Sequence, residues 1–251
     1  MASRRRLDAI LFDFWGTLAY PRVSIEEYYA YRARCVTEAL RAEGCNVSSD
    51  EVLEAFFKAR RLADTIRRET FREVPVRGEA VLLLRELGLD FTNERLIDLV
   101  SSAYMRPFMD LVEPAPGAAE TLTKLRDIGV KLGLVSNTME TPTLLAVMRK
   151  HGLLHFFDVI VTSDRVGFIK PSPFLFTYAL GLLGAQAAHS VFVGDEDADI
   201  RGAAAIGMWT VAFEGFHPYR GPPPHFKFSH YKDFLHVLST EFVLSKDRTK
   251  Q

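Results

Sequence analysis

The chain has 251 residues, of which 48% are hydrophobic and 25% are charged, a balance typical of a globular protein rather than a disordered or fibrous one. Its 31 Lys and Arg residues nearly match its 32 Asp and Glu residues, so a net charge of −1 gives no overall field to attract nucleic acid or an anionic membrane. The two cysteines, Cys35 and Cys45, are too few for a disulfide framework and lack the spacing of a zinc site. We therefore expect neither a nucleic-acid partner nor a membrane partner.

The N-terminal segment does not have the pattern of a signal peptide. Three arginines precede a short apolar run, Leu7 to Phe12, which Asp8 interrupts and Asp13 ends. Apolar stretches elsewhere fall far short of the roughly 18 residues that a membrane span needs. The sequence thus predicts a cytoplasmic protein.

The first predicted element is a strand, Ala9 to Asp13, whose apolar run suits burial on both faces of a sheet. Asp13 lies at the C-terminal end of this strand, and Gly16 then allows a sharp turn. From about Val23 to Met109, apolar residues recur at helical spacing with many charges between them. We therefore predict a helical insertion over residues 21–111.

The remaining chain alternates between helix and strand signals after a boundary at Pro114, Pro116 and Gly117. The predicted helices lie at 118–128, 144–151, 173–183, from about 199, and at 232–238. The predicted strands lie between them, at 130–135, 159–161, 190–193 and 209–212. Repeated strand–helix–strand units predict an α/β fold with a doubly wound parallel sheet, formed by residues 1–20 and 112–251.

Polar side chains follow several of the predicted strands. In such sheets ligands bind beyond the carboxyl ends of the strands, so these side chains should converge on one edge. They are Asp13, Ser136, Lys170, Asp195, Asp197 and Asp199.

Four motifs in this order resemble the haloacid dehalogenase superfamily of aspartyl-nucleophile hydrolases. They are Asp13–Leu18 (DFWGTL), Leu134–Asn137 (LVSN), Lys170–Pro171 and Val193–Asp199 (VGDEDAD). The resemblance implies a Rossmann-like core domain with an inserted α-helical cap, the cap being the helical segment 21–111. It also implies a hydrolase.

The resemblance assigns Asp13 as a nucleophile that forms a covalent ester with the substrate. A second oxygen of Asp13, the backbone carbonyl of Trp15 and the carboxylate of Asp195 would form part of a Mg²⁺ shell, since Mg²⁺ prefers oxygen ligands. Asp199 would orient a metal-bound water or Asp195, and it completes the predicted metal site. Asp197 could equally be only the N-cap of a helix that begins near Asp199.

The other predicted site residues would bind and neutralise an anionic small-molecule substrate. Thr17 and Ser136 would donate hydroxyl hydrogen bonds to substrate oxygens, and Lys170 would offset crowded negative charge and keep Asp13 ionised. Asn137 could bind substrate through its backbone N–H or simply cap the next turn.

Trp15 departs from the phosphatase pattern, because most phosphatases of this superfamily carry a second Asp two residues after the nucleophile as acid and base. Loss of such a group costs roughly 10²- to 10⁴-fold in rate, and Glu196 is the nearest candidate replacement in the sequence. The haloacid dehalogenases have an aromatic residue at this position, because a departing halide needs no proton. However, they have neutral residues where this chain has Asp195 and its acidic neighbours, and a bare acidic cluster favours a cation.

The predicted function is therefore a Mg²⁺-dependent phosphatase of a small phosphorylated metabolite, acting through an aspartyl-phosphate on Asp13. The alternatives are a metal-independent 2-haloacid dehalogenase and a catalytically weak binding or regulatory protein on the same scaffold. Arg60, Arg61, Arg67 and Arg68 could line an anionic entrance or form a solvated face paired with Asp64 and Glu69. The sequence does not identify the substrate or the oligomeric state.

Overall fold

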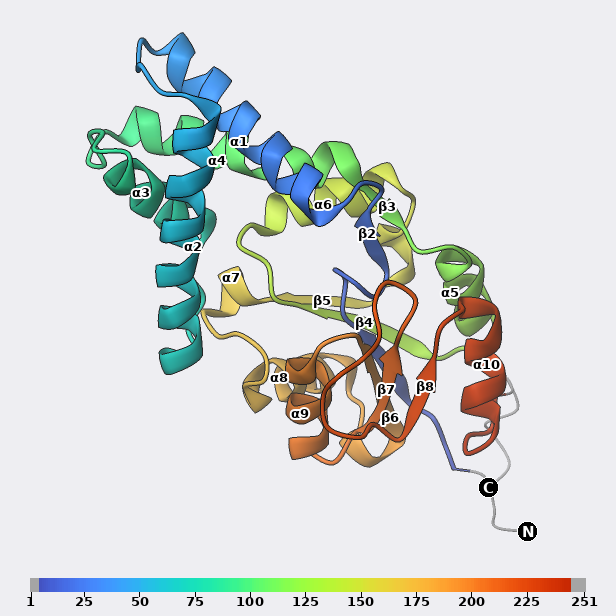
Figure 1. Cartoon of the computed structure of the whole chain (residues 1–251). Helices are drawn as coiled ribbons and strands as arrows, with labels where there is room; N and C mark the ends of the chain where they lie inside the picture. The colour runs from blue at the N-terminus through green and yellow to red at the C-terminus, as the bar shows by residue number, and fades with distance from the viewer. Residues whose placement is uncertain (1–4, 245–251) are drawn as a thin grey trace. The chain divides into compact units, whose positions relative to one another are not determined.

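The computed structural model describes residues 5–244 (Figure 1). Contacts divide the chain into two units, each described here by itself. The core unit contains the chain up to Tyr20, Pro114–Asn137 and the chain from Met148 onward, whereas the cap unit contains Pro21–Glu113 and Thr138–Val147. Compared with the expected insertion at 21–111, the cap unit extends to Glu113 and gains a second segment, Thr138–Val147. This segment groups with the cap unit because its backbone bonds to a cap helix, as described below.

The core unit is built on a six-stranded sheet with the order β5-β4-β1-β6-β7-β8. Every neighbouring pair is parallel, which confirms the predicted doubly wound α/β fold. The strands are β1 (Ala9–Phe12), β4 (Lys131–Ser136), β5 (Val159–Thr162), β6 (Ser190–Gly194), β7 (Trp209–Phe213) and β8 (Phe226–Phe228). Strand β8 had no counterpart in the sequence prediction.

Strand β1 lies in the middle of this sheet because all four of its side chains are apolar and buried. Phe12, its last residue, is in register with Leu134 of β4 and Val193 of β6. The residues that follow these three strands therefore emerge at the same edge. This arrangement brings distant segments of sequence together at one end of the sheet.

Helices flank both faces of the core sheet: Figure 1 shows α5 and α10 on one side and α8 and α9 on the other. The helices with bounds inside the core unit are α5 (Ala118–Asp127), α7 (Ser163–Val166), α8 (Pro173–Leu183), α9 (Asp197–Ala205) and α10 (Tyr231–Ser239), with 3₁₀ turns η1 (Leu154–Phe156) and η2 (Ala187–His189). Helix α8 begins with Pro173, whose fixed φ suits a first helical position, and ends at Gly184 in the left-handed region. Its buried side, including Phe176 and Leu180, packs against Leu11 and Phe192 of the sheet.

The cap unit consists mainly of four helices: α1 (Ile25–Ala42), α2 (Ser49–Thr70), α3 (Val76–Glu86) and α4 (Glu94–Leu111). Helices α1 and α2 each begin with a capping box, formed by Ser24 with Glu27 and by Ser48 with Glu51. Two short strands, β2 (Ala19–Pro21) and β3 (Val112–Pro114), pair where the chain passes between the units, and α6 (Thr141–Lys150) begins in the cap unit and ends in the core unit. None of the helices within residues 5–244 has the length and apolar character needed to cross a bilayer.

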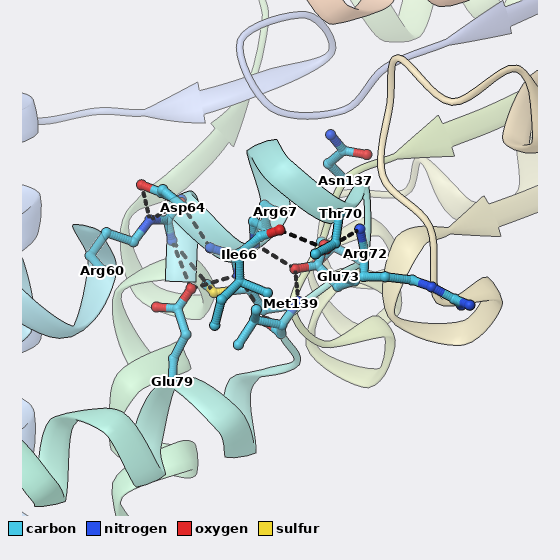
Figure 2. Close-up of polar contacts among 12 residues, drawn as sticks. Arg60, Asp64, Ile66, Arg67, Thr70, Arg72, Glu73, Glu79, Asn137 and Met139 are labelled. Carbon is cyan, nitrogen blue, oxygen red and sulfur yellow. Dashed lines mark hydrogen bonds and ion pairs between the residues drawn. The ribbon is translucent and has the colours of Figure 1, made fainter. Parts of the chain in front are cut away.

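The arginines of α2 take part in ion pairs within the cap unit. Arg67 is buried and lies 2.8 Å from Glu73 and 2.6 Å from Glu79, while Arg60 lies 3.2 Å from Asp64 (Figure 2). Arg61 and Arg68 are exposed. Arg60 and Arg67 thus pair with Asp64, as one of the two interpretations expected, and also with Glu79, which was not expected. Arg67 is buried rather than part of a solvated face.

Candidate active site

Three carboxylates meet at the carboxyl edge of the core sheet. Asp13 follows β1, and its backbone N–H continues the ladder by donating to the carbonyl of Val193 at 2.9 Å. Asp195 follows the neighbouring strand β6, and Asp199 lies in the first turn of α9. One carboxylate oxygen from each of Asp13, Asp195 and Asp199 lies within 4.8 Å of the others, and all three residues are buried. We refer to these residues as the acidic trio.

Lys170 brings one positive charge into the acidic trio. Its Nζ lies 2.5 Å from Asp13 Oδ1 and 2.6 Å from Asp199 Oδ1, and its side chain is only 3% exposed. Burial disfavours the charged ammonium, but the charges of Asp13 and Asp199 outweigh this effect and raise the lysine pKa above its ordinary value. Lys170 therefore stays protonated.

The carboxylates still outnumber the ammonium. Burial raises the pKa of Asp13 well above its usual value, Lys170 opposes this change, and the negative charges of Asp199 and Asp195 add to it. Burial likewise raises the pKa of Asp199, with Lys170 opposing and Asp195 adding. A bound divalent cation would favour ionisation of all three residues, because it brings opposite charge to the same oxygens.

The chemistry of these residues fits a hard cation such as Mg²⁺. The donors are carboxylate oxygens, which Mg²⁺ prefers, and they contain no sulfur or imidazole. Asp199 Oδ1 is buried and accepts no hydrogen bond, although it lies beside the Lys170 ammonium. Trp15, whose carbonyl is a predicted ligand, lies in the turn that joins β1 to β2.

Gly16 allows that turn to pass close to Asp195. Its φ of +79° is in the left-handed region, and a Cβ built on it would overlap the Asp195 carboxylate. A side chain at position 16 would therefore be strained and would also displace an acidic oxygen. Gly194 is similarly constrained, since a Cβ there would overlap Asp199.

Asp195 is held at both of its oxygens. The Thr17 hydroxyl donates to Oδ1 at 2.8 Å, and His217 Nε2 lies 3.0 Å from Oδ2. Thr17 was expected to donate to substrate, so its hydroxyl has a different partner here. The hydrogen bond to Asp195 raises the pKa of His217, partly offset by burial and reinforced by the charge of Asp195.

His217 is a site residue that the sequence analysis missed. It lies between the strand predicted at 209–212 and the helix predicted at 232–238, where no periodic pattern reports a residue's position. Its neighbour Phe216 stacks on Tyr20 of β2 with ring centroids 4.9 Å apart, which holds this segment near β2. The only signal was a histidine next to aromatic residues, and that is too common to identify a site.

The start of α9 corrects the expectation for Asp197. The N-cap is Glu196, whose backbone carbonyl accepts from the backbone N–H of Asp199 at 3.1 Å, and Asp197 is the first helical residue. Asp197 pairs with Arg201 at 2.7 Å on the surface. Asp199 Oδ2 accepts the backbone N–H groups of Asp195 and Glu196 at 3.1 and 3.0 Å, so it orients the loop that carries Asp195.

Glu196, the candidate replacement for the missing acid, lies at the start of α9 beside the acidic trio. Burial of its carboxyl group raises its pKa, and the charges of Asp199 and Asp195 add to this effect. A raised pKa suits a proton donor.

Ser136 and Asn137 follow β4, the other neighbour of β1. Ser136 is buried at the end of the strand. The Asn137 side chain binds the backbone of Lys170: its Oδ1 accepts from the Lys170 N–H at 2.8 Å, and its Nδ2 donates to the Lys170 carbonyl at 3.4 Å. Asn137 therefore connects the end of β4 to the segment that carries Lys170.

Comparison with known proteins identifies relatives of this arrangement. A family model described as haloacid dehalogenase-like hydrolase matches residues 7–207. The ribulose-1,5-bisphosphate 5-phosphatase of Halopiger xanaduensis is 30% identical over 209 residues, which cover 82% of this chain and 84% of that protein. The glyceraldehyde 3-phosphate phosphatase of Methanopyrus kandleri is 37% identical over 131 residues, which cover 52% of this chain and 55% of that protein.

Solved structures share the fold. A HAD phosphatase from Thermococcus onnurineus has a TM-score of 0.67 and 27% identity, and the match covers 94% of this chain and all of that one. A 2-haloacid dehalogenase from Pseudomonas syringae pv. tomato has a TM-score of 0.71 at 20% identity, with coverage of 93% and 99%. At that identity the second likeness concerns the fold alone, and both chemistries occur on it.

Proposed function

Because the chain belongs to the haloacid dehalogenase-like hydrolase family, we propose that it is a Mg²⁺-dependent phosphatase of a small phosphorylated metabolite. The observation that carries this proposal is the acidic trio, three buried carboxylates that lie together, of which only Asp13 and Asp199 contact the ammonium of Lys170. Such a cluster favours a cation, whereas halide displacement from a 2-halo acid requires none. The phosphatase names of the relatives, which include phosphoglycolate phosphatase from Aquifex aeolicus, support the same class of substrate.

In the proposed reaction a carboxylate oxygen of Asp13 attacks phosphorus, and the bond from phosphorus to the leaving oxygen breaks. The leaving oxygen takes up a proton, and the product alcohol departs from an aspartyl-phosphate. Water then attacks that phosphorus, releases phosphate and regenerates the Asp13 carboxylate. Two displacements thus replace one difficult displacement.

The other residues would bind the phosphoryl group and offset its charge. Ser136 and the backbone N–H of Asn137 would donate to phosphoryl oxygens, and Lys170 would neutralise charge beside the attacking oxygen. Asp13, the Trp15 carbonyl and Asp195 would hold Mg²⁺, with Asp199 orienting Asp195; bound Mg²⁺ would supply positive charge to the phosphoryl oxygens. Thr17 would hold Asp195 in place through the hydrogen bond described above.

The test is hydrolysis of an aryl phosphate, whose activated leaving group scarcely needs a proton donor. We expect turnover by the wild type with Mg²⁺, loss with EDTA, and a loss of at least about 10³-fold for Asp13→Asn. Asp195→Asn should raise the Mg²⁺ concentration needed for half-maximal activity, whereas Asp197→Asn, the same change two residues away at the start of α9, is a matched control that should not. No Mg²⁺- and Asp13-dependent turnover of aryl phosphates or of a panel of phosphorylated metabolites would overturn the proposal.

Trp15 favours a second candidate, a metal-independent 2-haloacid dehalogenase, since a halide leaves without a proton. Release of chloride from 2-chloropropionate in the presence of EDTA would support it. Absence of both activities, with unchanged binding of phosphorylated ligands in Asp13→Asn, would instead support a binding protein on this scaffold.

A further inference from the structure

The loop after β4 is fixed at two points that lie two residues apart. At the first point, Asn137 of the core unit binds both backbone polar groups of Lys170. At the second point, Met139 of the cap unit binds α3: the Val76 N–H donates to the Met139 carbonyl at 3.0 Å. Only Thr138 separates Asn137 from Met139, so the chain passes from one unit to the other between two anchored residues.

The cap anchor is rigid because ion pairs surround it. Arg60 Nη1 lies 3.6 Å from Met139 Sδ and 3.3 Å from Glu79, and its Nε donates to Asp64 at 3.2 Å (Figure 2). Glu79 itself is 1% exposed and also pairs with Arg67 at 2.6 Å. Displacement of a buried carboxylate with two arginine partners is unfavourable, because it leaves a buried charge unpaired. Met139 is therefore in contact with an ion-pair network that resists movement.

Asn137 binds the backbone of Lys170, and Lys170 in turn contacts Asp13, the proposed nucleophile. Asn137 sets the position of the Lys170 backbone, and the Lys170 ammonium lies 2.5 Å from Asp13 Oδ1 and 2.6 Å from Asp199 Oδ1. Ser136, the proposed phosphoryl ligand, precedes Asn137 in the chain. A displacement of Met139 would thus be transmitted through one intervening residue to Ser136, Asn137 and Lys170.

We propose that Met139 and its partner Val76 are positioning residues that couple the cap unit to the phosphoryl-binding residues Ser136, Asn137 and Lys170. The order of these phosphoryl-binding residues then depends on the hydrogen bond between the Val76 N–H and the Met139 carbonyl. The inference rests on the proposed phosphatase function for its kinetic effect, but its structural effect on Lys170 does not depend on turnover.

Val76→Pro tests the coupling with little other change. Val76 is the first residue of α3, where proline is well tolerated, and the preceding Pro75 has a ψ of 162°, which suits a residue before proline. The substitution removes the N–H that binds Met139 and keeps an apolar side chain. Val76→Ala is the matched control, because it keeps the N–H and removes more of the buried side chain.

The first readout is amide hydrogen exchange of Lys170 in ¹⁵N-lysine-labelled protein. We expect Val76→Pro to accelerate this exchange about three- to tenfold, the range that one hydrogen bond supports, and Val76→Ala to leave it unchanged. The second readout is kinetic. In Val76→Pro the KM for an aryl phosphate should rise about three- to tenfold, and this fold-change should exceed the fold-decrease in kcat. A merely structural role of the bond would lower the melting temperature and leave both readouts at wild-type values.

A folded Val76→Pro variant with wild-type exchange at Lys170 and wild-type KM would overturn the inference. If Val76→Pro does not fold, Met139→Ala decides the question by the same readouts, since it removes the contact with Arg60 and keeps the carbonyl. An inactive wild type would contradict the phosphatase proposal alone, because the exchange measurement at Lys170 would still test the coupling.

Discussion

The Nζ atom of Lys170 lies 2.5 Å from Oδ1 of Asp13, in an ion pair whose two side chains are 3% and 7% exposed. Such an ion pair affects the protonation of Asp13, the proposed nucleophile. Lys170 lowers the pKa of Asp13 relative to what burial and the neighbouring carboxylates would impose, although the pKa stays raised overall.

Lys170→Met should therefore shift the acidic limb of the pH–kcat/KM profile to higher pH. Without the ammonium the Asp13 pKa rises further, so less of the nucleophile is ionised at a given pH. Activity at the optimum should fall about 10²- to 10³-fold, as for the loss of an oxyanion donor. The profile is measured at saturating Mg²⁺, with Lys131→Met, a lysine of the same unit outside the site, as the control. An acidic limb that stays in place or moves to lower pH would contradict this account.

Trp15→Asp should supply a proton donor at the position where most phosphatases of this family carry one. Alkyl phosphates need protonation of the leaving oxygen, so we expect their turnover to rise at least about tenfold, while aryl phosphates change little. Trp15→Asn is the matched control, because it has the same size as Asp and no titratable proton. An equal rise for Asn and Asp would show that removal of the indole, not proton donation, is the cause.

Gly16→Ala should abolish activity, because its Cβ would overlap the Asp195 carboxylate. Gly44 provides the comparison: its φ is +83°, and a Cβ there meets nothing within 4 Å. Gly44→Ala should cost about 1 to 2 kcal/mol of stability from the backbone conformation alone and leave kcat/KM unchanged. Denaturant unfolding and aryl phosphate kinetics are measured on both variants. They separate the effect of backbone strain, which both variants share, from displacement of the Asp195 carboxylate, which only Gly16→Ala causes. Full activity in Gly16→Ala would be inconsistent with the observed approach of this turn to Asp195.

Glu79→Gln should destabilise the cap unit by about 3 kcal/mol, because it leaves the buried Arg67 and the half-buried Arg60 without their shared carboxylate. Glu94→Gln makes the same chemical change at an exposed pair with Arg77 and should cost less than about 1 kcal/mol. Urea unfolding measures both differences. Similar costs for the two variants would show that the Glu79 network adds nothing beyond a surface pair.

The convergence of Asp13 and Asp195 was predictable, because polar residues that follow buried parallel strands emerge at one edge. Lys170 lies beyond α7, further from its strand, and its place in the site was expected from the order of the motifs. The position of His217 was not predictable, since its segment has no periodicity and depends on a ring contact between Phe216 and Tyr20. Sequence order assigned Met139 to the core domain, whereas its contacts group it with the cap unit. Its partners Val76 and Arg60 are far away in the chain, and no local pattern reports such a contact. Strand β8 has three residues, one of them an exposed lysine, which is too short for an alternating pattern.

The central place of β1 has a consequence for how the protein acquires activity during folding. Asp13 and Lys170 are 157 positions apart, and Thr17 and Asp195 are 178 positions apart, so their contacts are among the least local in the chain. Non-local pairing is slow, because the loop entropy is lost before the contacts form. In refolding experiments, helical signal from the cap should return first. Turnover should return only when β4 and β6 have docked on both sides of β1, which makes catalysis a kinetic reporter of the completed sheet.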